Sequence, residues 1–131
     1  MTGRSSKKDG ARELAVAAAR AALDNNAEDI VVLDLRGVSP VTGYFVICTG
    51  SSSRQMRTVA QAVTTDGKAI GQDVWHVAGL DSGEWILLDF VDVVVHIFDQ
   101  PHREYYDLEL MWGQAPRVRW RRRAPIAKRR R

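Results

Sequence analysis

The most informative segment of the chain is EWILLDFVDVVVHIFDQPHREYYDLELMW, residues 84–112. Its two apolar runs, 84–90 and 93–98, are joined by the dipeptide at 91–92, and this pattern predicts a β-hairpin. Residues 102–113 follow with helical spacing and predict a closing helix.

Ionisable side chains interrupt these apolar runs at Asp89, Asp92 and His96. A strand pair needs none of them in order to fold, and burying such a group without a partner is costly. They therefore either complete internal hydrogen bonds or face a binding partner.

The remaining segments predict further elements of both kinds. Residues 11–25 are rich in Ala, Leu, Glu and Arg and predict a helix, and a second helix follows Ser52 and Gln55, which are spaced as a capping box. Strands are predicted at 30–35, 44–49 and 73–77. The order α-β-β-α-β-β-β-α predicts an α/β (α+β-like) fold, with a single mixed β-sheet of about five strands and helices packed against it.

Length and composition predict one domain. The chain has 131 residues, 45% of them hydrophobic, and we expect a disordered N-terminus at 1–10, a domain at 11–115 and a basic disordered tail at 116–131. The single Cys48 excludes an internal disulfide framework, no apolar run approaches the roughly 18 residues of a membrane span, and the polar start is unlike a signal peptide. These features predict a soluble, cytoplasmic protein.

Charge is divided sharply along the chain. Residues 1–115 contain all 16 acidic residues and ten Lys or Arg, a net charge of −6, whereas residues 116–131 contain nine basic residues and no acidic one. An acidic domain favours a basic protein as its main partner, and a basic tail is suited to RNA phosphates.

Catalytic and metal-binding patterns are weak. The turn at 49–53 offers free amides to a phosphate, and nucleotidyltransferases carry a Gly-Ser pair at such a position. Those enzymes also need carboxylates close behind the pair to hold divalent metals, but here none follows before Asp66. Helix capping is therefore the favoured interpretation of this turn. The three histidines and Cys48 have no metal-ligand spacing, and no positioned nucleophile is evident. We therefore expect a non-enzyme with no cofactor or metal.

Alternation along the hairpin places Trp85 and Asp89 on the same face as His96. An Asp89–His96 contact across the strands and a binding role for these side chains both fit this placement, and Trp85 is either a core residue or an exposed anchor. In the closing helix, spacing places Tyr105, Leu108 and Trp112 toward the core, and it places Tyr106, Glu109 and Gly113 outward.

Two segments resemble the Iojap family of ribosomal silencing factors. The first is DLRGVSPVTGYFVICTGSSSRQ at 34–55, and the second is EWILLDFVDVVVHIF followed by REYYDLELMW within 84–112. The match spans about residues 14–112, in the order and spacing of the family pattern. It implies a nucleotidyltransferase-like fold without catalytic carboxylates.

The resemblance also implies a function. Family members bind ribosomal protein number fourteen of the large ribosomal subunit, sterically block joining of the small subunit and repress translation when nutrients are scarce; some pair as homodimers. The positions that match the family pattern, taken as ribosomal-protein-binding candidates, are Trp85, Asp89, Asp92, His96, Arg103, Tyr106, Glu109 and Trp112.

The tail departs from the family pattern. Its Trp120 stands among arginines, so an arm that contacts ribosomal RNA through phosphates and one stacking ring is one interpretation, and a solubilising disordered tail is the other. The tail candidates for RNA binding are Arg117, Arg119, Trp120, Arg121, Arg122 and Arg123. A nucleotidyltransferase-like enzyme and a general RNA-binding module remain the alternative functions.

Overall fold

The structure, a computed structural model, describes residues 2–122 and contains one five-stranded mixed sheet. The strands are β1 (Glu28–Asp34), β2 (Tyr44–Thr49), β3 (His76–Ala78), β4 (Trp85–Asp89) and β5 (Val93–Phe98). The helices are α1 (Thr2–Asp24), α2 (Ser53–Ala69), α3 (Gln100–Tyr106) and α4 (Leu108–Met111). The predicted fold class and the mixed sheet are confirmed.

The strand order is β1-β2-β5-β4-β3, with β2 and β5 parallel and the other pairs antiparallel. The long α2 lies between β2 and the hairpin, which lets β5 return parallel to β2 at the centre of the sheet. The predicted hairpin forms with its turn at 91–92, and Phe90 and Val93 close it through a 2.8 Å backbone hydrogen bond.

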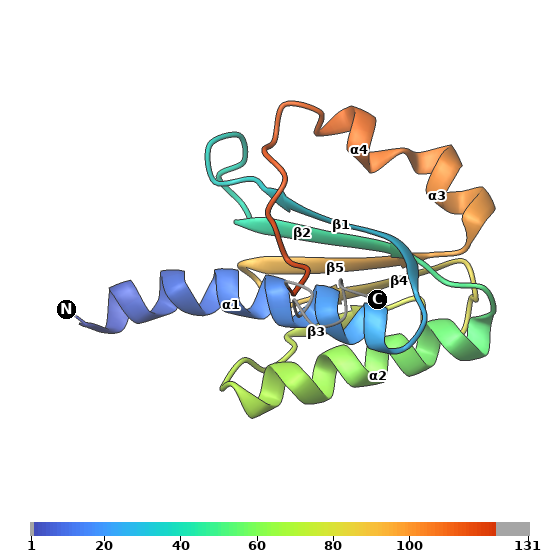
Figure 1. Ribbon diagram of the computed structural model, residues 1–131, viewed down its shortest axis with the longest axis horizontal. Helices are drawn as coiled ribbons and strands as arrows, with labels where there is room; N and C mark the ends of the chain where they lie inside the picture. Colours follow the sequence, from blue (N-terminus) through green and yellow to red (C-terminus); the bar gives the residue numbers. More distant parts are fainter. Residues whose placement is uncertain (1, 123–131) are drawn as a thin grey trace, which may run out of the picture.

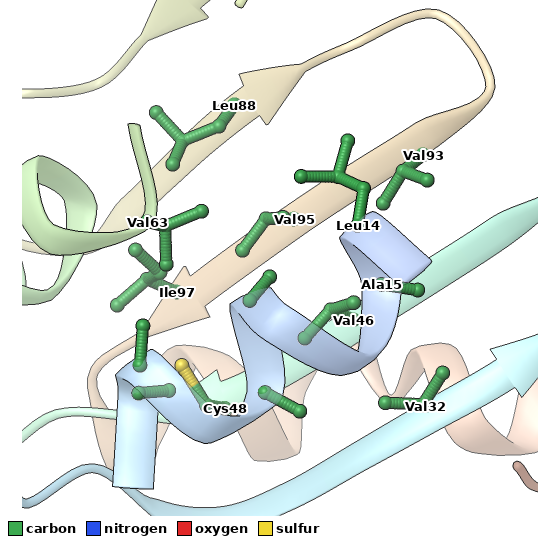
Figure 2. Packing of buried hydrophobic residues seen from close by; sticks show 14 of the residues in the cluster. Leu14, Ala15, Val32, Val46, Cys48, Val63, Leu88, Val93, Val95 and Ile97 are labelled. Atoms are coloured by element: carbon green, nitrogen blue, oxygen red, sulfur yellow. The ribbon is translucent and has the colours of Figure 1, made fainter. Parts of the chain in front are cut away.

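The helices α1 and α2 cover one face of the sheet (Figure 1). Because side chains alternate along strands, every second residue of β2, β4 and β5 points toward these helices. The resulting core is packed with small residues of α1 and with aliphatic side chains of the sheet, so the helix approaches the strands closely (Figure 2). Its labelled members include Leu14, Ala15, Val46, Val63, Leu88, Val95 and Ile97.

The capping box at the start of α2 forms with one difference from the expected pattern. The hydroxyl of Ser52 accepts a hydrogen bond from the amide of Gln55 at 3.1 Å, as predicted. The side chain of Gln55 accepts from the amide of Ser51 at 2.6 Å rather than from that of Ser52. Both bonds use amides that a phosphate would otherwise need.

The opposite face of the sheet is covered in part by α3, α4 and the chain that follows (Figure 1). The predicted closing helix at 102–113 is instead two short helices, because Asp107 adopts a left-handed conformation with φ 43°. Asp107 ends α3, and its side chain accepts a hydrogen bond from the amide of Leu110. This bond caps the start of α4. The prediction that Tyr105 faces the core was therefore wrong, because Tyr105 is exposed. Tyr106 is exposed as predicted, and its ring also packs on Trp85.

The first part of the basic tail is structured, so the prediction of disorder from residue 116 was wrong there. The carbonyl of Pro116 accepts from Asp34, and the amide of Val118 donates to Val32, both at 2.8 Å, which places residues 116–118 along the edge of β1. Val118 and Trp120 are buried, whereas Arg117, Arg119 and Arg121 are exposed. This period of two is typical of a strand-like segment.

The N-terminal segment also differs from the expectation. Residues 2–10, expected to be disordered, continue α1 as helix. Extending an existing helix costs far less than nucleating one, and no proline separates these residues from the alanine-rich segment. In the described part of the chain, no helix is both long and apolar enough to cross a membrane.

Replacing Trp120 by Ala tests the docking of the tail. Trp120 is 6% exposed and packs in the main core, so Trp120→Ala should lower the free energy of unfolding by about 3 kcal/mol. Urea denaturation measures this change, with Arg119→Ala as the control because Arg119 is exposed and its loss should alter stability by less than about 0.5 kcal/mol. Equal stability of Trp120→Ala and the parent chain would show that the tail does not dock.

Candidate functional site

The uncovered part of the second sheet face forms a groove of about 640 Å³, here called the sheet groove. It lies beside the turn of the β4–β5 hairpin and the loop between β1 and β2. Its lining is mainly apolar and consists of Ser39, Val41, Thr42, Phe45, Trp75, Leu87, Asp89, Val91, Val94, His96 and Trp112.

The floor of the sheet groove comes from three adjacent strands. Phe45 of β2 pairs with Val94 of β5, and Leu87 of β4 pairs with His96 of β5, so all four side chains lie on the face away from α1 and α2. One wall is Trp112, whose ring meets that of Phe45 edge to face at 5.8 Å.

The opposite wall is formed by Trp75 and residues near it. The backbone amide of Trp75 donates to the carbonyl of Asp89 at 2.8 Å, which fixes the start of this wall beside β4. The side chain of Trp75 is nevertheless 74% exposed, and that of Val41 across the groove is 81% exposed. Large apolar side chains gathered around one concavity on a sheet face are typical of a protein-binding surface.

His96 is held in a defined tautomer at the floor of the sheet groove. The indole N–H of Trp85, which can only donate, lies 3.1 Å from Nδ1 of His96. Nδ1 is therefore the acceptor, and the proton of the neutral ring is on Nε2. His96 is only 4% exposed, and this burial lowers the pKa of its ring to about 4.

The predicted contact between Asp89 and His96 was wrong. Leu87, not Asp89, is the cross-strand partner of His96, and the hydrogen bond to the ring comes from Trp85. The carboxylate of Asp89 instead accepts from the amide of Val91 at 2.7 Å, and it borders the groove. Asp89 thus stabilises the hairpin turn and places a negative charge at the rim.

The turn itself is strained at Val91. This β-branched residue has φ 76°, and the amide of Asp92 reaches back to the carbonyl of Phe90 at 3.0 Å across it. Such backbone geometry costs on the order of 1–3 kcal/mol in a residue other than glycine. The side chain of Val91, held in this way, is about half exposed at the groove rim.

Trp85 belongs to an aromatic cluster next to the groove. Its ring lies 4.9 Å from that of Phe98 and 4.6 Å from that of Tyr106, centroid to centroid. Trp85 is half-buried in this cluster, so it mainly joins β4 to α3 and orients His96.

Arg103 and Glu109 are brought together away from the sheet groove. The guanidinium of Arg103 is nearly buried, donates to the hydroxyl of Thr49 at 2.9 Å and pairs with Glu109 at 2.8 Å. Glu109 also accepts from Arg117 at 3.1 Å. These bonds tie α3, α4 and the tail segment to the end of β2, which is a structural arrangement, and Asp92 stands apart from them at the exposed hairpin turn.

The tail candidates do not form a free stacking arm in the described residues. Trp120 is buried, so its ring cannot stack on a base, and the guanidinium of Arg121 lies 4.8 Å from the centre of that ring. Arg119 and Arg122 are exposed. Arg123 lies outside the described residues.

No metal site is apparent within residues 2–122, because no group of three or more His, Cys, Asp or Glu side chains gathers there. Cys48 is buried in the main core, and this burial raises the pKa of its thiol to about 12. A thiol with so high a pKa is a poor nucleophile at neutral pH.

Several groove residues were not predicted from the sequence. Phe45, Leu87 and Val94 could have been found by extending the alternation argument from His96 to the neighbouring strands. Trp75 and Val41 lie in segments outside the strands, and no local pattern shows that these segments meet across the groove.

The pKa of His96 predicts a specific pH dependence of stability. The unfolded chain takes up a proton on this ring near pH 6.5, whereas the folded chain does so only near pH 4, so acid favours unfolding between these values. The contribution of the neutral His96 ring to the free energy of unfolding is complete above about pH 6.5, and it falls by about 3 kcal/mol as the pH drops to about 4. Urea denaturation at steps across this range measures it.

His96→Gln is the comparison variant for this measurement, since it removes the titrating ring. The pKa of the Asp34 carboxyl is lowered by its hydrogen bond from Arg36, so that group titrates below the window. The parent chain should lose more stability than the variant between pH 6.5 and 4. Parallel curves would contradict the burial of a neutral His96.

Comparisons with known proteins agree in pointing to one family. A family model described as ribosomal silencing factor during starvation matches residues 8–131. The ribosomal silencing factor of Bacillus subtilis is 43% identical over 99 residues, which are 76% of this chain and 84% of that protein. The chloroplastic protein Iojap of Zea mays is 39% identical over 104 residues, which are 77% of this chain and 44% of that protein.

Two solved structures share the fold. A protein from Chromobacterium violaceum superposes with a TM-score of 0.75 at 34% identity, covering 86% of this chain and 93% of that one. A protein from Bacillus halodurans gives a TM-score of 0.71 at 34% identity, covering 82% of this chain and 98% of that one. With the family model matching nearly the whole chain, this protein belongs to the ribosomal silencing factor family, which includes Iojap.

Proposed function

We propose that this protein binds the large ribosomal subunit and sterically prevents the small subunit from joining it, which represses translation during nutrient limitation. The observation that carries the proposal is the sheet groove with its exposed Trp75 and Val41, set in a domain of net charge −6. A large exposed apolar side chain on a concave surface of an acidic domain suits a basic protein partner.

The partner that we propose is ribosomal protein number fourteen of the large subunit. The family relationship supports this choice, as does the opposite charge expected of a ribosomal protein that itself binds RNA. The mechanism needs occupancy of a surface and no reaction, so we propose neither substrate nor cofactor.

A cytoplasmic location and a homodimer of the free protein accord with the same proposal. The strand β3 remains as an uncovered sheet edge at which two copies could pair.

Six of the eight candidate residues divide into two groups under this proposal. Asp89, Tyr106 and Trp112 lie at or beside the sheet groove with exposed surface, and we assign them to the docking face. Trp85, Arg103 and Glu109 act mainly by holding that face in shape.

Co-sedimentation with separated ribosomal subunits tests the proposal. The protein should pellet with large subunits and not with small subunits, and light scattering should show that it suppresses their joining when magnesium is raised. The control is a Trp75→Asp variant, which places a charge in the apolar face and should lose both effects. A chain that does not pellet with large subunits would refute the proposal, and tight binding to free RNA instead would favour an RNA-binding module.

The end of the tail is proposed to add contacts with ribosomal RNA phosphates. Arg119 and Arg122 are exposed, and five further basic residues follow in 123–131. Each phosphate contact should steepen the dependence of affinity on salt.

A chain ending at Arg122 tests the RNA contact without disturbing the docked Trp120. Its affinity for large subunits should fall less steeply with salt than that of the full chain, by about 0.7–0.9 in the log–log slope for each phosphate contact removed. Thermal denaturation of both chains serves as the control for folding. Identical slopes would exclude the RNA contact and leave the tail as a solubilising segment.

A further inference from the structure

Two polar atoms near the floor of the sheet groove have no hydrogen-bond partner within the described residues. They are Nε2 of His96 and the hydroxyl of Thr42, and each is buried in a residue that lines the groove. Buried polar groups are nearly always paired in folded proteins, because leaving one unpaired costs about 1–3 kcal/mol. Two such groups in one apolar groove indicate a place that an occupant completes.

The chemistry of His96 defines what the occupant must offer. Nδ1 is engaged by the indole of Trp85, so Nε2 carries the proton and can only donate. An occupant must therefore bring a hydrogen-bond acceptor to the floor. Phe45, whose ring meets that of His96 edge to face at 4.5 Å, keeps the approach to this donor apolar.

The walls define the rest of the occupant. Trp112 packs on Phe45 of β2, and the backbone of Trp75 is hydrogen-bonded to Asp89 of β4. Because β5 lies between β2 and β4, the two tryptophans stand on opposite sides of the groove. The groove that both residues line has a volume of about 640 Å³, which is large enough for the apolar stem of one long side chain. Asp89 at the rim disfavours a carboxylate and favours a neighbouring Lys or Arg.

We propose that the sheet groove is a socket for one side chain of the basic ribosomal protein partner, with an apolar stem between Trp75 and Trp112 and a neutral acceptor at its tip that is bound by Nε2–H of His96. A basic side chain of the same partner then lies at Asp89. The inference rests on the proposed function and identifies His96 as the residue that determines specificity.

Strain at the rim fits the same socket. Val91 is held at φ 76° with its side chain half exposed over the groove, although glycine would adopt this geometry at no steric cost. Strained residues cluster at active sites and ligand-binding sites. We assign Val91 to the rim that closes on the stem.

A pair of His96 variants tests the donor, with large ribosomal subunits as the probe. The amide nitrogen of Gln can occupy the place of Nε2 and keep a donor in the groove, whereas Asn is too short and can only replace the Nδ1 acceptor for Trp85. His96→Asn should weaken binding to large subunits about tenfold, and His96→Gln should stay within about threefold of the parent chain. Equal affinity of all three chains, or the reverse order, would overturn the proposal.

Two further variants keep the test decisive if the His96 variants unfold. Val91→Gly should be at least as stable as the parent chain, because it relieves the strain, yet bind large subunits more weakly. Trp75→Ala should weaken binding by about tenfold or more, while Tyr105→Ala, equally exposed on α3 and outside the groove, should change it by less than about twofold. Equal effects of the last two variants would contradict the socket.

The outcomes separate the socket from the proposed function. If the parent chain pellets with large subunits and the groove variants bind equally well, the function stands and the socket is refuted. If the parent chain does not bind, both are refuted.

Discussion

The β-sheet has two apolar faces, and helices cover one of them completely and the other only in part. β5 is central and lies between β2 and β4, so its residues point alternately toward α1 and α2 or toward the second face. The short α3 and α4 and the segment after them cover the second face over β1, β2 and the end of β5. The sheet groove is the area that remains, and the other features of the site follow from it.

The hydrogen bond between Trp85 and His96 connects the covered and uncovered parts of that face. Trp85 packs against Phe98 and Tyr106 on the covered side, and through its indole N–H it fixes the tautomer of His96 on the uncovered side. The consequence is a buried, unpaired donor in a residue that lines an apolar groove. Burial keeps the ring neutral, so this donor is the same throughout the physiological pH range.

The sequence was informative where local rules determine the structure. Alternation assigned Trp85, Asp89 and His96 to one face, and the spacing of Ser52 and Gln55 located the start of α2. The direct partner of His96 could also have been obtained, because a turn at 91–92 that pairs Phe90 with Val93 necessarily pairs Leu87 with His96. The Asp89–His96 contact failed because the nearby amide of Val91 takes the carboxylate.

The sequence was less informative where distant segments decide. Asp107 is a helix breaker only through its left-handed backbone, and helical spacing alone predicted one continuous helix and placed the exposed Tyr105 toward the core. Trp120 stands in a run of arginines that resembles a disordered tail, yet it is buried because the β1 edge is free to pair with the segment before it. Trp75 reaches the groove only through the path of the chain around β3.

Oxidative footprinting by hydroxyl radicals, on the free protein and on its complex with large ribosomal subunits, tests whether the sheet groove faces the ribosome. Trp75, which is largely exposed in the free protein, should be protected in the complex, while Leu23 at the end of α1 should be oxidised equally in both. Unchanged oxidation of Trp75 together with protection of Leu23 would contradict the account, since docking would then use the helical face.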